Sequence, residues 1–511
     1  MGVNTSFLRV ILIIASGSLV SACTSVSPGT FGNIVIRNAT IVDGTGRDPY
    51  VGSVRIRGSL IVDVGEVTPT ADDLVVPAEN LVLTPGFVDT HSHHDAGLLI
   101  KPQALGAISQ GITTIVVGQD GTSNFPLSDY FKRLQSNAPT VNVASYTGHN
   151  TLRSQVMGED FQRPATEQEV QQMATALRQD MDAGSFGLGT GLEYDPGIYS
   201  ETSEVIALAR VASELGGRYI SHIRSEDRYF WDAVDELISI GREASLPVHM
   251  SHAKLAMKSL WGQTDRLIEK LDTARAQGIN VTLDVYPYDY WQSTLRVLFP
   301  DRDFQSLEAA RLVLSDIAPA DGIALAEYRP DPTLAGKTLA QIAETRDTDP
   351  AQVLLDLIEQ AYEDPAAANA SVESMLGRSM RDEDIVDLLN WRFANVCSDG
   401  GSNGGHPRGF GAFPRIIHRY VKQQNRFTLA QAIRKMTLQS AQNLGISDRG
   451  WIGPGAVADL VLFDLNTIKD NANPGNPTVV SSGISSVWVN GQTVYASGVV
   501  TGRMPGQVLR R

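Results

Sequence analysis

Apolar, β-branched runs alternate with amphipathic stretches through the middle of the chain. The apolar runs are typical of strands buried on both faces, and an apolar residue at every third or fourth position is typical of a helix with one buried face. Repeated units of this kind form a parallel sheet, and eight of them favour a closed (β/α)8 TIM-like barrel of the α/β class. The predicted strands are residues 86–92, 113–118, 141–146, 186–191, 218–223, 247–252, 281–287 and 393–398. The clearest predicted helices are residues 166–183, 202–215, 231–244 and 263–277.

The two ends of this region have a different pattern. Residues 33–83 contain short strands separated by turn glycines, and residues 450–505 contain a second strand-rich stretch. Two such segments at opposite ends of the chain predict one small β-sandwich domain built from both termini. Residues 84–449 then form the barrel, with an insertion or lid at about residues 298–385 before the last strand.

Residues 1–23 have the order of a secretory signal, because their apolar run is too short to span a membrane and lacks a stop-transfer flank. Small residues directly before Cys23 resemble the lipobox of bacterial lipoproteins, which predicts that Cys23 is lipidated and that residues 24–32 form a tether. An ordinary signal peptide cleaved near Ala22 is the alternative. We expect an exported lipoprotein on the periplasmic side of a bacterial membrane. Thr24 favours the outer membrane by resemblance to the usual sorting pattern.

Composition narrows the class of protein. The chain of 511 residues is 42% hydrophobic and 19% charged, which is typical of a globular protein with a sizeable core. Its net charge of −15 argues against nucleic acid as a partner, and it leaves the lipid anchor as the expected contact with a membrane. The sequence does not indicate an oligomeric state.

The histidines are few, and four of them fall at the ends of predicted strands. His91 and His93 end the first strand, where alternate side chains point the same way, and His222 and His252 end the fifth and sixth. Neutral imidazoles are good zinc ligands. Asp399 follows the last strand, where a carboxylate can bind metal and transfer a proton. An Asp-Gly turn is the alternative interpretation of Asp399 alone.

Together these residues resemble the metal site of the amidohydrolase superfamily, and the surrounding sequence resembles the D-aminoacylase (N-acyl-D-amino-acid deacylase) family. The resemblance covers about residues 33–500 and is weakest across 300–390. It implies a barrel with a β-sandwich and one or two bound Zn²⁺ ions. The matching motifs are Pro85–His91, Gly111–Gly118, Gly189–Gly197, Ser221–Glu226, Asp284–Tyr288 and His406–Arg415.

One position departs from the family pattern. The family has a metal-binding or metal-bridging cysteine in the loop after the second strand, and this chain has Asp120 there. A carboxylate can also bridge two zinc ions, so we expect Asp120 to be a metal ligand. Because a carboxylate is harder than a thiolate, other divalent metals are possible. The fourth strand has no lysine between Phe186 and Tyr194, so the carbamylated lysine of hydantoinases and dihydroorotases is not available there.

The resemblance also implies a substrate and a mechanism. It assigns the binding of an α-carboxylate to Lys254, Tyr286, Ser293 and Arg408. The implied reaction is hydrolysis of the amide bond of N-acyl-D-amino acids, which releases a carboxylate and a free D-amino acid. Metal-activated water attacks, and Asp399 serves as general base and then general acid. A D-dipeptidase or cyclic-amide hydrolase of the same superfamily is an alternative, and a non-catalytic binding lipoprotein is a further one.

We predict that the full-length protein is membrane-bound and is labelled by fatty acid. Cys23→Ser should abolish the labelling, because the Cys23 thiol is the predicted site of acylation. Metabolic labelling with palmitate, followed by membrane fractionation, measures both properties. A soluble periplasmic protein that begins at an unmodified Cys23 would contradict the lipoprotein assignment.

Overall fold

The computed structural model describes residues 33–363, 372–402 and 404–511. The predicted signal, the lipobox with Cys23 and the tether at 24–32 lie outside the described residues. Within them, no helix combines the length and apolar character needed to cross a membrane.

The eight predicted strands are present in the predicted order, and they form a (β/α)8 barrel. They pair in parallel as two runs, which meet where Tyr146 donates its backbone N–H to the carbonyl of Val117. The ring closes where β7 (Ser92–His93), which continues the first strand, pairs with β19 (Gly400–Gly401), which continues the last. The barrel strands are β6 (Phe87–Asp89), β8 (Ile112–Val117), β9 (Asn142–Ser145) with β10 (Thr147–Gly148), β11 (Gly187–Gly191), β12 (Arg218–His222), β13 (Val248–Met250), β14 (Val281–Val285) and β18 (Ala394–Val396).

Amphipathic helices cover the outside of the barrel. In α4 (Glu167–Ala183) the apolar positions Met173, Leu177 and Met181 recur every four residues and are buried. A capping box at Thr166 begins this helix. The other predicted helices are α5 (Thr202–Glu214), α6 (Phe230–Ala244) and α7 (Thr264–Ala276). Further helices around the barrel are α1 (Leu105–Ile108), α2 (Leu127–Ser136), α3 (His149–Met157), α11 (Asp382–Asn390), α12 (Arg408–Arg415), α13 (Leu429–Met436) and α14 (Leu438–Leu444).

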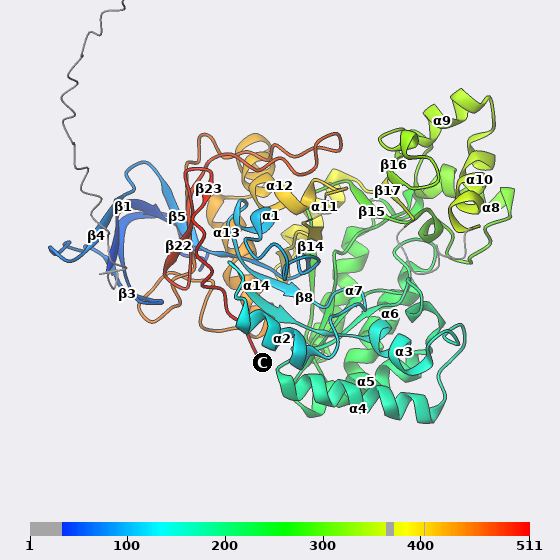
Figure 1. Cartoon of the computed structure of the whole chain (residues 1–511), viewed down its shortest axis with the longest axis horizontal. Coiled ribbons are helices and arrows are strands. Elements are labelled where there is room, and N and C mark those ends of the chain that lie inside the picture. The colour runs from blue at the N-terminus through cyan, green and yellow to red at the C-terminus, as the bar shows by residue number, and fades with distance from the viewer. Residues whose placement is uncertain (1–32, 364–371, 403) are drawn as a thin grey trace, which may run out of the picture.

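Strands from both ends of the chain lie side by side in a β-rich domain, blue and red at the left of Figure 1. They form one nine-stranded sheet, which curls so that Leu60 bridges to Val457. The sheet encloses an apolar cluster that includes Ile36, Val54 and Trp488. Its strands are β1 (Ile34–Ile41), β2 (Tyr50–Arg57), β3 (Leu60–Gly65), β4 (Leu74–Pro77), β5 (Val82–Pro85), β20 (Leu460–Phe463), β21 (Ile484–Val489), β22 (Gln492–Ala496) and β23 (Val499–Val500).

The predicted insertion is a separate small subdomain on the right of Figure 1. It leaves the barrel after β14 and begins with β15, earlier than the predicted residue 298, and it ends before α11, which packs against α7 and β18 as a barrel helix. Because it emerges where β14 ends, it lies at the carboxyl-terminal mouth of the barrel. Its elements include the antiparallel strands β15 (Tyr290–Ser293), β16 (Ile323–Tyr328) and β17 (Glu373–Arg378) with α8 (Leu307–Leu312), α9 (Leu339–Arg346) and α10 (Pro350–Tyr362).

Candidate active site

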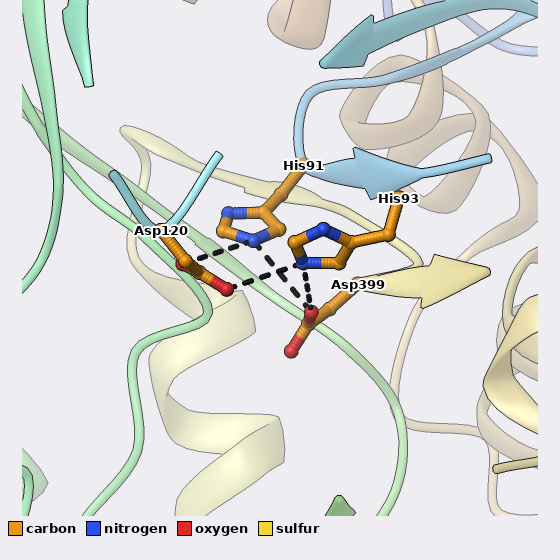
Figure 2. A group of neighbouring side chains, drawn as sticks. All are labelled: His91, His93, Asp120 and Asp399. Atoms are coloured by element: carbon orange, nitrogen blue, oxygen red, sulfur yellow. Dashed lines mark hydrogen bonds and ion pairs between the residues drawn. The ribbon is translucent and has the colours of Figure 1, made fainter. Parts of the chain in front are cut away.

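A cavity of about 320 Å³ opens at this mouth, and its lining contains most of the residues predicted for the site. Figure 2 shows four of them converging from three parts of the chain: His91 and His93 after the first strand, Asp120 after the second and Asp399 after the last. His93 Nε2 lies 3.1 Å from Asp120 Oδ2 and 3.3 Å from Asp399 Oδ1. His91 Nε2 lies 3.3 Å from Asp120 Oδ1 and 3.6 Å from Asp399 Oδ1.

A second group of ligand atoms shares the same aspartate. His252 Nε2 lies 3.2 Å from Asp120 Oδ1 and 3.0 Å from His222 Nδ1, and His222 Nδ1 lies 3.9 Å from Asp120 Oδ1. Each group brings at least three possible metal ligands within 4.8 Å of one another, and Glu193, His222 and Glu226 form a third group of this kind. The structure therefore puts Asp120 between two imidazole pairs, which is the position needed to bridge two ions.

The chemistry of this donor set fits divalent cations. His91 Nε2 and Asp399 Oδ1 are buried and face the same space without a hydrogen-bond partner among the described residues. Because buried polar atoms rarely lack a partner, these two atoms fit a site that a cation completes. Two imidazoles and two carboxylates in one group, with two imidazoles and a shared carboxylate in the other, are ligands that zinc accepts.

The charged residues that line the cavity also favour the binding of a cation. Five carboxylates line it, and its cationic residues among those described are Lys254 and Arg408. Buried negative charge is costly unless cations offset it. Burial would lower the pKa of His93 and of His252, but the neighbouring carboxylates more than offset this and raise both to about 10, so both imidazoles attract a proton in the place where a metal ion would bind. The carboxylates are Asp120, Glu193, Glu226, Asp227 and Asp399.

Three of the converging residues have a strained backbone. The φ angles of Asp120, His252 and Asp399 are +52°, +34° and +49°. Non-glycine residues rarely adopt this left-handed region, and such strain costs roughly 1–3 kcal/mol per residue. It persists only where the surrounding structure holds the residue firmly, so these three side chains are fixed in place at the expense of stability.

Two buried aspartates hold the strained segments in place. Asp89 accepts hydrogen bonds from the Ser398 backbone N–H at 2.7 Å and from the Ser398 hydroxyl at 2.5 Å, next to Asp399. Asp284 accepts the His252 backbone N–H at 2.6 Å and the Thr90 hydroxyl at 2.5 Å. Neither aspartate is among the site residues predicted from the sequence, although both lie inside motifs that carry the family resemblance.

Three of the four residues predicted to bind the substrate carboxylate meet on one side of the cavity. Lys254 Nζ lies 5.6 Å and Arg408 Cζ lies 4.8 Å from the centre of the Tyr286 ring. The Tyr286 hydroxyl is buried with no hydrogen-bond partner among the described residues. Ser293 is not among the described residues that line the cavity, whereas its neighbour Gln292 is. The structure thus brings together Lys254, Tyr286 and Arg408, but not Ser293.

Both cations are already paired with carboxylates. Lys254 Nζ donates to the two carboxylate oxygens of Glu226 at 2.6 and 2.7 Å, and Arg408 Nη1 lies 2.6 Å from Asp399 Oδ2. Burial raises the pKa of Asp399, but Arg408 and the neighbouring imidazoles more than offset this and hold it well below its ordinary value. Arg408 therefore touches both the predicted general base and the space where a substrate carboxylate would bind.

Two glutamates that were not predicted from the sequence also contact the imidazoles. Glu193 Oε2 lies 2.8 Å from His222 Nε2, and Glu226 Oε1 lies 3.1 Å from His252 Nδ1. Burial, together with Asp227 and Glu226, raises the pKa of Glu193 well above its ordinary value. A divalent cation beside His222 would act in the opposite direction. The signal for both glutamates was their place in the motifs Gly189–Gly197 and Ser221–Glu226.

The sequence of this chain is similar to those of known metal-dependent hydrolases. A model of the amidohydrolase family matches residues 74–362 and 395–495. An N-acyl-D-glutamate deacylase of Alcaligenes xylosoxydans xylosoxydans is 33% identical over 94% of this chain and 96% of its own length. The chain belongs to the amidohydrolase family.

Two solved structures extend the comparison of this amidohydrolase. A crystal structure of D-aminoacylase is 31% identical and superposes with a TM-score of 0.82 over 94% of this chain and 100% of its own. An N-acyl-D-glutamate deacylase from Bordetella bronchiseptica, complexed with zinc and a phosphonate inhibitor that mimics the tetrahedral intermediate, is 32% identical, with a TM-score of 0.83 over 94% and 100%. D-aminoacylase has a binuclear metal centre. These findings confirm the family and the fold predicted from the sequence.

We predict that Asp120→Asn loses bound metal and activity together, because an amide removes the negative charge shared by the two groups of imidazoles. Asp120→Cys should bind metal again, with an altered preference among zinc, cobalt and manganese. Asp95→Asn, in a carboxylate outside the groups of possible ligands, is the matched control and should keep its metal. Elemental analysis after dialysis measures the effect, and full zinc occupancy with normal turnover in Asp120→Asn would contradict the ligand assignment.

Proposed function

We propose that this protein hydrolyses the amide bond of N-acyl-D-amino acids in a metal-dependent reaction. The observation that carries the proposal is the shared position of Asp120 between two imidazole pairs, with Asp399 and a group of carboxylate-binding residues in the same cavity. The named relatives are deacylases of N-acyl-D-amino acids, which supports this substrate class. The proposed metal is Zn²⁺, as one or two ions, held by His91, His93, Asp120, His222, His252 and Asp399.

Asp399 is the residue proposed to move the proton. A divalent ion held by these residues would supply Lewis acidity to the scissile carbonyl and would lower the pKa of water to ~7. Asp399 then accepts a proton from the attacking water and delivers it to the nitrogen of the leaving amine. Its carboxylate is held beside the imidazoles of His91 and His93 and beside Arg408.

Arg408, Lys254 and Tyr286 are proposed to hold the α-carboxylate of the substrate. A guanidinium has five N–H donors, and the ion pair with Asp399 leaves donors that can grip a carboxylate. The Tyr286 hydroxyl, which has no hydrogen-bond partner among the described residues, is a further donor at the same place. When the α-carboxylate and the scissile amide are both held in place, the site can accept one configuration at the α-carbon between them and reject the other.

The cyclic-amide alternative is less well supported by this site. A lysine on the fourth strand, which hydantoinases and dihydroorotases carbamylate, is missing between Phe186 and Tyr194. Asp120 belongs instead to two of the groups of possible metal ligands, which supports a bridging role for its carboxylate. A non-catalytic binding role does not account for a complete set of ligands together with a proton-transferring carboxylate.

We also propose that the reaction takes place outside the cytoplasm, on the periplasmic side of a bacterial membrane. The support is the order of residues 1–23 and the resemblance of the residues before Cys23 to a lipobox. A lipid anchor contributes about 0.8 kcal/mol for each methylene that it buries, so it needs no basic surface on this acidic protein.

We expect the zinc-loaded full-length protein to release free D-amino acid from N-acetyl-D-methionine, N-acetyl-D-glutamate or N-acetyl-D-aspartate, and not to hydrolyse the L-enantiomers. Chiral chromatography of the products measures both, and D-containing dipeptides and hydantoins test the alternatives in parallel. Removal of metal by a chelator should abolish turnover, and added zinc should restore it. Metal-loaded protein that releases no D-amino acid from any N-acyl substrate would overturn the proposal.

Arg408→Ala should lower kcat/KM for N-acyl-D-amino acids by about 100-fold, because loss of the anchor misplaces the scissile amide. The control is a second substrate, an N-acyl amine of the same shape that lacks the α-carboxylate. Its slow hydrolysis should change much less, since it has no carboxylate to anchor. An equal fall for both substrates would assign the effect to Asp399 instead of to carboxylate binding.

A further inference from the structure

His222 and His252 turn opposite ring nitrogens toward Asp120. His222 presents Nδ1, which lies 3.0 Å from His252 Nε2, whereas His252 presents Nε2 to Asp120 Oδ1 at 3.2 Å. A neutral imidazole carries a proton on one nitrogen and a lone pair on the other. Each ring can therefore bind a cation at this point only if its proton sits on the nitrogen that faces away.

Each outward nitrogen faces a buried glutamate. Glu193 Oε2 lies 2.8 Å from His222 Nε2, and Glu226 Oε1 lies 3.1 Å from His252 Nδ1. Glu193 is 4% exposed and Glu226 is 7% exposed, so solvent does not compete strongly for either contact. When ionised, the Glu193 carboxylate only accepts hydrogen bonds, so it holds the N–H of His222 on Nε2 and leaves the Nδ1 lone pair free to face a cation.

We propose that Glu193 is a positioning residue that selects the metal-facing nitrogen of His222. The inference rests on the metal site of the proposed function and adds a residue that orients one of its ligands. At His252 the Lys254 ammonium, which can only donate, lies 2.8 Å from Nδ1 beside Glu226, so the proposal is confined to Glu193 and His222.

The test uses Glu193. Glu226 holds the ammonium of Lys254 at 2.6 Å, so replacing Glu226 would disturb the substrate-binding side of the cavity. A residue of the inserted subdomain contacts Glu193: Arg302 Nη2 donates to the Glu193 backbone carbonyl at 2.5 Å. The same guanidinium donates through Nη1 to the carbonyl of Arg296, which also belongs to the inserted subdomain. The inserted subdomain therefore reaches His222 through Glu193.

The chain offers a matched control outside the cavity. Glu204 Oε1 lies 2.8 Å from His149 Nε2, the same length as the Glu193 contact, and both of these residues are buried. Glu204 does not belong to the described groups of possible metal ligands. Replacing it breaks a buried His–Glu contact of the same length, together with the buried ion pair of Glu204 with Arg153, without touching the metal site.

The experiment compares Glu193→Gln, Glu193→Asp and Glu204→Gln in the full-length protein. Zinc affinity is measured by competition with a chelator, and thermal stability and the separate values of kcat and KM are measured alongside. Glu193→Gln should weaken zinc binding by about 10–100-fold, because its amide can donate to Nε2 and favour the wrong tautomer of His222. Glu193→Gln should lower kcat, and this change should be larger than any change in KM. Glu193→Asp should recover part of the affinity, and Glu204→Gln should lower stability alone.

Each contrary result has a distinct meaning. Zinc affinity in Glu193→Gln equal to that of the unaltered protein would overturn the positioning role. An equal loss of affinity in Glu204→Gln would overturn it too, since the effect would then be a general loosening of the fold. Unaltered protein that binds no divalent metal would overturn the proposed function itself.

Discussion

The carboxylate of Asp120 lies between two pairs of imidazoles, and the arrangement of the whole mouth of the barrel depends on it. Burial would raise its pKa, but His91 and His252 hold it well below the ordinary value, so the group stays negative. Its position requires a sharp turn directly after β8. Gly118 makes this turn with φ of +78°, and a Cβ there would lie 2.1 Å from the backbone oxygen of Tyr146.

The barrel serves as the rigid frame for residues that are individually unfavourable. Asp120, His252 and Asp399 all have left-handed backbones, and all follow strands whose own residues are buried. Asp89 and Asp284 tie two of these segments to neighbouring strands through hydrogen bonds of 2.5–2.7 Å. Because such bonds are short and buried, they over-determine the backbone and let strain persist at the site.

Charge pairing links the proposed metal ligands to the proposed carboxylate-binding residues. Arg408 contacts Asp399, and Lys254 contacts Glu226, which in turn contacts His252. A substrate carboxylate would thus meet cations that already touch a proposed ligand or a residue in contact with one. These contacts place both proposed sites at the same few strand ends of one cavity.

The sequence by itself determined the barrel, the β-rich domain made from both ends and most of the residues that converge at the barrel mouth, because strand periodicity and histidines at strand ends are local features. It also singled out Asp120, since a single departure from a family motif is visible in one chain. The contacts of Glu193, Glu226, Asp89 and Asp284 were decided only by the tertiary structure. Their partners lie on other strands, and a glutamate in a loop looks the same in sequence whether it faces solvent or an imidazole nitrogen 2.8 Å away.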